Sequence, residues 1–256
     1  MKNIRVIARL DVKGPHLVKG IQFEGLRKLG DPNTFAKKYW KEGADEILYL
    51  DIVASLYGRS NLVEILEETT KEVFVPITAG GGVRTVKDAE VLLRAGADKV
   101  AVNTGCIKNP ELIGEIAKTF GSQCLVLSIE AKRKEDGTWE AYYESGREKS
   151  GLDAVAWAIE GAQRGAGEIL VTSVDKDGTQ RGFDLDLVRS IAESVPVPVI
   201  CAGGLGKEQD AIDAVREAKA DAIAGGAFFH YNEGGIARVK HTLREEGILV
   251  RIHTNE

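Results

Sequence analysis

Cysteine and histidine are both scarce in this sequence. Cys106, Cys124 and Cys201 are the only three cysteines in 256 residues, an odd number without CxxC spacing. Such a set favours neither a disulfide framework nor a zinc site. The four histidines show no ligand spacing either. They are His16, His230, His241 and His253, none of which has an apparent partner, and we expect His241 and His253 to face solvent. We therefore expect no metal and no other cofactor.

The sequence also lacks long apolar runs and an excess of positive charge. No apolar run is long enough to cross a bilayer, and residues 1–5 lack the pattern of a signal peptide. We therefore expect a cytoplasmic protein that does not enter a membrane. The formal net charge of −5 argues against a general nucleic-acid surface, although local basic patches for a phosphorylated substrate remain compatible with it. Small molecules are the expected ligands.

An internal repeat organises the chain. The segment 75–82, VPITAGGG, has its counterpart in 197–204, VPVICAGG, with an offset of 122 residues. The segment 46–48, EIL, recurs at 168–170 with the same offset. With 43% hydrophobic residues, a chain of this length can bury one large core. We expect a single domain, 1–256, made of two halves, about 1–122 and 123–256.

Short β-branched runs alternate with helical stretches through both halves, a pattern typical of βα units. The predicted strands are 4–10, 46–51, 73–79, 98–103, 124–130, 168–173, 197–202 and 221–225. Eight units in two matching halves predict a (β/α)₈ barrel, or TIM barrel, and a doubly wound open sheet is the weaker alternative. Two long insertions, 13–30 and 131–150, follow the first and fifth strands. The first is expected to be a loop over bound substrate, and Asp136-Gly137 predicts a hairpin in the second.

Two carboxylates follow corresponding strands, Asp11 in the first half and Glu130 in the second. In a barrel of this kind, the chemistry lies at the carboxyl ends of the strands. Side-chain alternation places Asp11 on the same face as Arg9, and Glu130 on the same face as Ser128. Two acids in different surroundings can divide the work of general acid and general base. The structural alternative is that either acid caps a loop or pairs with a lysine, such as Lys19.

Glycines recur at strand ends in both halves, where backbone N–H groups can approach an anion. Tight turns are the alternative explanation, but the recurrence favours two phosphate sites on opposite sides of one mouth. The expected contacts of the first half are Gly81, Gly82, Asn103 and Thr104. Those of the second half are Thr172, Asp177, Gly178, Gly203, Gly204, Gly225 and Gly226, with Gly206 also near a helix start.

Four charged residues lie near the amino ends of the predicted strands: Arg5, Glu46, Lys99 and Glu168. Two positive and two negative side chains at this level are able to close a ring across the barrel floor. Their spacing by itself supports only a structural salt-bridge network.

An ordered set of motifs resembles HisF, the cyclase subunit of imidazole glycerol phosphate synthase, over residues 4 to 252. The motifs include the segments 6–13, 30–32, 50–52, 80–82, 97–100, 103–104, 120–123 and 177–179. The resemblance implies a barrel that takes ammonia from a HisH-like glutaminase at its N-terminal face. The ammonia closes an imidazole ring on a bisphosphate ribulosyl substrate, which gives imidazole glycerol phosphate and an aminoimidazole carboxamide ribonucleotide.

The resemblance also implies roles for individual residues. Asp11 is similar to the family's general base, and Lys19 to a mobile-loop lysine beside the substrate. Asp98 matches a contact with the glutaminase. The residues on the barrel floor match the family's ammonia gate in all four positions: Arg5, Glu46, Lys99 and Glu168.

Two residues depart from the family pattern. Glu130 replaces an aspartate, and its extra methylene moves the carboxyl by about 1 Å. Arg9 stands where a cysteine is usual and is expected to point into the barrel below Asp11. There it would bind one or both carboxylates, favour their charged forms and narrow the ammonia path. Its role as structural anchor or substrate ligand is open at this point.

These two departures also resemble a divergent HisF-like branch of surface-polysaccharide clusters. In that branch, the barrel delivers ammonia for turning an acetamido sugar into an acetamidino sugar. The two phosphate sites favour the ring-closing cyclase, which we place first. They also argue, with the two carboxylates, against a non-catalytic scaffold that only activates a glutaminase. The sister isomerase HisA uses no ammonia, so the complete gate counts against that assignment.

Overall fold

Eight parallel strands close into a barrel in the computed structural model, which describes residues 3–54 and 62–252. The barrel strands are β1 (Arg5–Lys13), β4 (Glu46–Asp51), β5 (Ile77–Gly80), β6 (Lys99–Val102), β7 (Leu125–Arg133), β10 (Glu168–Ser173), β11 (Val199–Ala202) and β12 (Ala222–Gly225). Strand β1 pairs in parallel with both β4 and β12, and β7 pairs with both β6 and β10. The predicted (β/α)₈ barrel is confirmed, and the open-sheet alternative is wrong because no edge separates β12 from β1.

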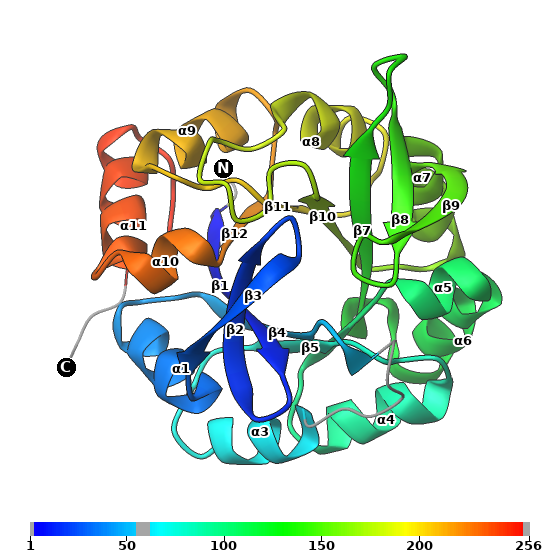
Figure 1. Cartoon of the computed structure of the whole chain (residues 1–256), viewed down its shortest axis with the longest axis horizontal. Helices are drawn as coiled ribbons and strands as arrows, with labels where there is room; N and C mark the ends of the chain where they lie inside the picture. The colour runs from blue at the N-terminus through cyan, green and yellow to red at the C-terminus, as the bar shows by residue number, and fades with distance from the viewer. Residues whose placement is uncertain (1–2, 55–61, 253–256) are drawn as a thin grey trace.

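Helices surround the strands (Figure 1). They are α1 (Pro32–Lys41), α3 (Leu62–Thr69), α4 (Val86–Arg94), α5 (Thr104–Lys108), α6 (Glu111–Phe120), α7 (Ala154–Arg164), α8 (Leu185–Ala192), α9 (Glu208–Arg216), α10 (Ala227–Tyr231) and α11 (Gly235–Glu245). The Asp31 side chain caps α1 by accepting from the Thr34 amide at 2.7 Å. Thr85 and Asp88 form a capping box at α4. None of the helices in the described segments is both long and apolar enough to cross a membrane.

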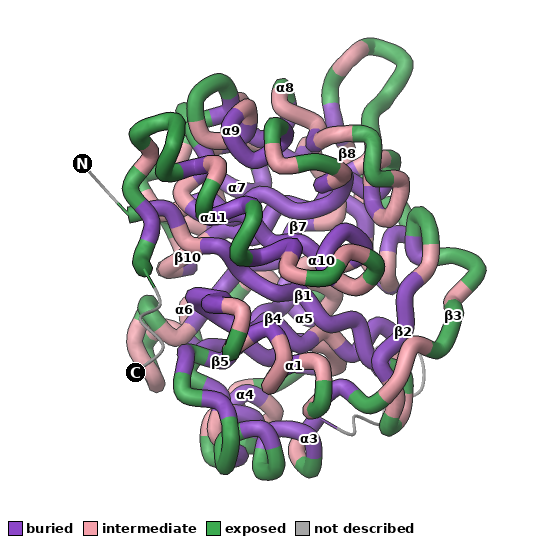
Figure 2. Tube along the Cα trace, turned by 90° about the vertical axis from the view of Figure 1, so that its left-hand side faces the viewer, coloured by how far each residue is buried: buried purple, intermediate pink, exposed green. Residues whose placement is uncertain are grey.

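The centre of the molecule is buried (Figure 2), and alternation along the strands separates two apolar cores within it. One set of side chains packs outward between the strands and the helices, including Val6, Ala8 and Leu10 of β1. The other set fills the inside of the barrel, including Ile7, Val126 and Leu170. Arg9 and Asp11 share the inward parity of Ile7, as the alternation predicted. Strand β1 therefore carries charge to the inside of the barrel mouth.

Both insertions form two-stranded hairpins on the same end of the barrel. Strands β2 (His16–Ile21) and β3 (Glu24–Gly30) follow β1, and they cross the barrel opening in Figure 1. Strands β8 (Trp139–Tyr143) and β9 (Glu148–Asp153) extend β7. The Asp136-Gly137 turn lies where the sequence predicts it, between β7 and β8, with Gly137 at φ +85°. The first insertion differs from the expected loop because it is regular antiparallel structure.

Candidate active site

Strands β1 and β2 place Asp11 between two cations. The Arg9 Nε donates to Asp11 Oδ1 at 2.8 Å, and the Lys19 Nζ donates to Asp11 Oδ2 at 2.7 Å. The side chains of Asp11 and Arg9 are 2% and 3% exposed. Burial favours the neutral acid, but the charges of Arg9 and Lys19 hold the pKa of Asp11 well below its usual range. Asp11 is therefore a buried, ion-paired carboxylate.

The second half of the barrel completes this charge cluster. Lys19 Nζ also donates to both carboxylate oxygens of Asp177, at 2.9 and 3.1 Å. Arg9 Nη1 donates to Thr172 Oγ1 at 3.0 Å, and the Phe23 ring lies 5.4 Å from the guanidinium carbon. Lys19 is buried, yet the carboxylates of Asp11 and Asp177 raise its pKa. The pairing of Asp11 with Lys19, which was the structural alternative to a catalytic role, is thus present, and it includes Asp177 as a third member.

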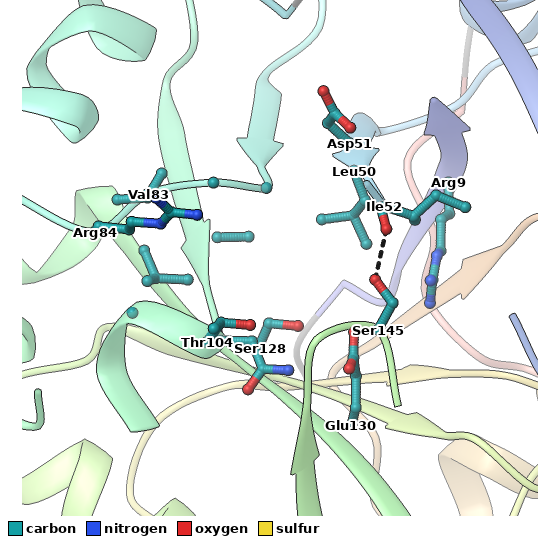
Figure 3. Close-up of a pocket in the computed structure, with 16 residues that line it drawn as sticks. Arg9, Leu50, Asp51, Ile52, Val83, Arg84, Thr104, Ser128, Glu130 and Ser145 are labelled. Atoms are coloured by element: carbon teal, nitrogen blue, oxygen red, sulfur yellow. Dashed lines mark hydrogen bonds between the residues drawn. The ribbon is translucent and has the colours of Figure 1, made fainter. Parts of the chain in front are cut away.

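Glu130 lies in a different environment on β7. Its Oε2 accepts from the Gly146 amide at 2.7 Å, and the side chain borders an open pocket (Figure 3). Burial raises the pKa of Glu130 to about 7, against the opposing effect of the Arg9 charge. The expectation that Arg9 favours the charged form of its neighbours is correct for Asp11. The Arg9 charge also favours the ionised form of Glu130, as expected, but burial has the larger effect on its pKa.

The pocket in Figure 3 joins the first set of predicted phosphate contacts to the barrel mouth. Gly81, Gly82, Asn103 and Thr104 all line it, together with Arg9, Ser128 and Glu130. Asn103 Nδ2 donates to the Tyr142 carbonyl at 3.1 Å, and Thr104 Oγ1 accepts from the Glu144 amide at 3.1 Å. Both side chains therefore also hold the β8–β9 hairpin in place.

A second pocket gathers the predicted contacts of the other half except Thr172, whose hydroxyl accepts from Arg9. It is lined by Arg9, Lys19, Asp177, Gly178, Gly203, Gly204, Leu205, Ala224, Gly225, Gly226 and Ala227. Of the described residues that line these two pockets, Arg9 alone borders both. Gly206 does not join the second pocket, because its amide donates to the Asp210 carboxylate at 2.8 Å. A ligand that occupies both pockets must pass Arg9.

Gly204 is a position where the second pocket requires glycine. Its φ is +122°, and a Cβ there would overlap the Gly182 carbonyl oxygen. We expect Gly204→Ala to lower the free energy of unfolding by about 3 kcal/mol. Gly137→Ala is the matched control, since Gly137 has φ +85° but no atom within 4 Å of an added Cβ. It should cost only about 1 kcal/mol. Equal losses in urea unfolding would contradict the close-packing argument.

The four predicted floor residues form a closed ring of ion pairs. Arg5 contacts Glu46 at 2.8 Å and Glu168 at 3.1 Å. Lys99 contacts the same two carboxylates at 2.8 and 3.3 Å. Thr78 donates a further hydrogen bond to Glu46 at 2.5 Å. The arrangement predicted from spacing is confirmed, and its use as a gate stays a proposal.

Asp98 lies exposed just below the ring, immediately before β6. Its carboxylate accepts from the Ile77 amide at 2.8 Å, so it stabilises the start of β5 within this chain. That hydrogen bond leaves its expected contact with a partner untested.

Comparison with known proteins identifies one family for this barrel. A family model described as "Histidine biosynthesis protein" matches residues 5–234. Imidazole glycerol phosphate synthase subunit HisF of Legionella pneumophila is 58% identical over 210 residues. That alignment covers 82% of this chain and 99% of the relative. The chain belongs to the HisF family. The resemblance on which the expected residue roles depend is therefore confirmed at the level of the family.

Sequence reasoning missed one part of this HisF-family site, the turn between β8 and β9. Glu144 and Ser145 both have positive φ, at 52° and 58°, which is unusual for residues with a side chain. Ser145 Oγ donates to the Ile52 carbonyl at 2.7 Å, as Figure 3 shows, and Lys108 contacts Glu144 at 2.7 Å. The turn brings the Gly146 amide to Glu130. Neither of its first two positions holds a glycine, the residue type from which a turn with positive φ is usually predicted.

The histidines also differ in part from expectation. His230 has a partner, since its Nδ1 lies 2.7 Å from the Tyr39 hydroxyl, and burial lowers its pKa to about 3. His241 is solvent-exposed as expected, with 69% of its side chain accessible. His253 lies outside the described residues. Across residues 3–54 and 62–252, no group of three or more His, Cys, Asp or Glu side chains is arranged to hold a metal.

Proposed function

We propose that this HisF-family chain is an ammonia-dependent cyclase. Its substrate is a ribulosyl compound with two phosphates, and its products are imidazole glycerol phosphate and an aminoimidazole carboxamide ribonucleotide. One observation carries the proposal: two glycine-lined pockets flank the same charged mouth, which holds Asp11 and Glu130. Two separate anion sites fit a substrate with a phosphate at each end. The relative named as HisF supports the same reaction.

We propose that the ammonia comes from a HisH-like glutaminase on the N-terminal face of the barrel. The ion-pair ring lies at this end, below the apolar interior that leads to the mouth. Three apolar side chains in the segments at this end are exposed, Phe74 by 71%, Leu249 by 45% and Ile252 by 58%. A partner that docked on this face would cover them. The cytoplasm is the compartment that this pathway enzyme would occupy.

Opening the ring of ion pairs should affect turnover with glutamine and the glutaminase more than turnover with added ammonium salt. We expect Glu46→Gln to weaken both ion pairs that Glu46 makes and to leave Arg5 and Lys99 with one shared carboxylate. Turnover with added ammonium salt should stay within about threefold of the unmodified protein, because the mouth is untouched. Turnover with glutamine and the glutaminase should fall by about tenfold, as a lost charge-assisted interaction of about 1.4 kcal/mol implies. Equal losses in both assays would contradict a gating role.

The proposed reaction is tested by supplying the purified chain with the bisphosphate ribulosyl substrate and excess ammonium salt at mildly alkaline pH. Imidazole glycerol phosphate should form without any partner, and Glu130→Gln should lower turnover by at least about 100-fold, the usual contribution of a general acid or base. Absence of product from folded protein that still binds a glutaminase would overturn the proposal.

Arg9 supports a second candidate function, ammonia delivery for amidation of an acetamido sugar. The guanidinium lies between the two pockets and is fixed to both Asp11 and Thr172, so it stands where a substrate spanning both pockets would pass. Under this reading, the barrel carries ammonia to a separate acceptor site. The same assay separates the two functions, because only the cyclase forms imidazole glycerol phosphate from ammonium salt.

A further inference from the structure

The charged groups at the centre of the mouth form a set that is already balanced. Arg9 and Lys19 supply two positive charges, and Asp11 and Asp177 supply two negative charges, with contacts of 2.7 to 3.1 Å. All four side chains are buried. An ionised Glu130 would add a third carboxylate to this set of two cations and two carboxylates. Buried charge without a partner is costly, so the balance favours a neutral Glu130.

Asp11 has little capacity to take up a proton. Each of its oxygens accepts a charge-assisted hydrogen bond, one from Arg9 and one from Lys19. Protonation would weaken both bonds and leave two buried cations to share Asp177. A general base must gain and lose a proton near the working pH. The contacts of Asp11 instead hold it in one charge state.

Glu130 has the opposite arrangement. Only Oε2 is engaged by a described donor, the Gly146 amide, and the side chain borders an open pocket. It faces Arg9 and Asp11 of β1 and Asp177, which follows β10. Two further charged residues, Asp51 and Arg84, border the same pocket. The environment is compatible with either charge state, which a proton-transfer group requires.

We propose that Arg9 is a positioning residue that, with Lys19, keeps Asp11 permanently ionised and leaves Glu130 as the catalytic residue that exchanges protons with the bound acceptor. This inference rests on the proposed ammonia chemistry. As the ammonia nitrogen bonds to an electrophilic carbon, the C=O π bond breaks and the acceptor oxygen takes the proton of Glu130. The Glu130 carboxylate then takes the proton that the new C–N nitrogen loses. Asp11 stabilises the nearby cations throughout.

The test is a ¹³C NMR titration of the side-chain carboxyls in the full chain, from pH 4 to 9. Asp11→Asn and Glu130→Gln identify the two resonances by their disappearance. We expect the Glu130 signal to titrate with a midpoint of about 7, since burial raises its pKa to about 7. The Asp11 signal should stay that of a carboxylate over the whole range. An Asp11 midpoint between pH 5 and 8, or a Glu130 midpoint below about 5, would overturn the proposal.

Arg9→Met separates the charge of Arg9 from its bulk. Removal of the guanidinium should raise the midpoint of Glu130 by about one pH unit, because a nearby positive charge favours the carboxylate. Arg9→Lys should restore the unmodified midpoint. Arg94→Met, on the exposed surface of α4, is the control and should leave the midpoint unchanged. A role of Arg9 in packing alone predicts no shift in Arg9→Met, and that result would contradict the proposal.

The titration needs no substrate, so its outcome is independent of which acceptor the protein uses. If Arg9→Met does not fold, the titration of the unmodified protein still shows whether Glu130 alone, or both Glu130 and Asp11, change charge between pH 5 and 8. Failure to form imidazole glycerol phosphate with the expected titration would remove the cyclase and keep the division of roles. Formation of imidazole glycerol phosphate by a protein whose Asp11 titrates between pH 5 and 8 would support the cyclase and overturn the division of roles between Asp11 and Glu130.

Discussion

Replacing Asp11 by asparagine should lower the free energy of unfolding by about 3 kcal/mol at pH 7. The reason is the balanced cluster: without Asp11, the buried Arg9 and Lys19 have only Asp177 as a charged partner. Urea unfolding measures the loss. Asp186→Asn serves as the matched control, because Asp186 lies exposed on α8 and should change stability by no more than about 0.5 kcal/mol.

A double variant tests whether charge balance is the cause. Arg9→Met with Asp11→Asn removes one cation and one carboxylate together, so the remaining Lys19 and Asp177 still pair. The double variant should be destabilised by no more than about half as much as Asp11→Asn alone. Additive losses from the two changes, or a fully stable Asp11→Asn, would show that the cluster does not act as a balanced unit.

Replacing Glu130 by glutamine should stabilise the protein at pH 8.5 and have little effect at pH 5. Burial raises the pKa of Glu130 from 4.5 to about 7, so the folded protein binds a proton that the unfolded chain has released. This contribution is fully present below pH 4.5 and is lost as the pH rises through 7. Glutamine never ionises, and its oxygen can still accept from the Gly146 amide. The expected gain at pH 8.5 is about 3 kcal/mol.

Urea unfolding at the two pH values measures this difference. Glu135→Gln is the control, since Glu135 lies exposed in the β7–β8 turn. Its free energy of unfolding should differ from that of the unmodified protein by the same small amount at both pH values. Equal stabilities of Glu130→Gln and the unmodified protein at both pH values would mean that Glu130 ionises as readily when folded as when unfolded. A loss of stability at pH 8.5 would mean that the ionised carboxylate is stabilised in the fold.

The barrel could be predicted from sequence because its evidence is local and repeated. Each strand is a short β-branched run, and the half-chain offset repeats the pattern. The hairpin of β7 and β8 was predicted from Asp136-Gly137, a pair suited to a turn with positive φ. The hairpin of β2 and β3 could not be predicted in this way, because its turn residues Gln22 and Phe23 adopt φ of 52° and 61° although neither is glycine. Contacts in the folded protein, such as Gln22 to the Asp177 carbonyl, accompany that turn.

The site was predictable only where strand alternation and symmetry apply. They placed Arg9 and Asp11 on one inward face and Glu130 at the corresponding strand end. They could not reveal that Lys19 bridges to Asp177, 158 residues away, or that Arg9 bonds to Thr172, 163 residues away. The net shift in the pKa of Glu130 could not be predicted for the same reason. A single neighbour is visible in the sequence, whereas the burial that outweighs it belongs to the whole fold.

Transfer of nitrogen into an imidazole ring tests the proposed function most directly. The chain, a HisH-like glutaminase and the bisphosphate ribulosyl substrate would be mixed with glutamine carrying ¹⁵N in its amide, in the presence of excess unlabelled ammonium salt at pH 7. If the chain is the cyclase and its ammonia path is enclosed, imidazole glycerol phosphate should form, and the one ring nitrogen that ammonia supplies should be mostly ¹⁵N. Glutamine hydrolysis without any imidazole product would contradict the account and favour delivery of ammonia to another acceptor.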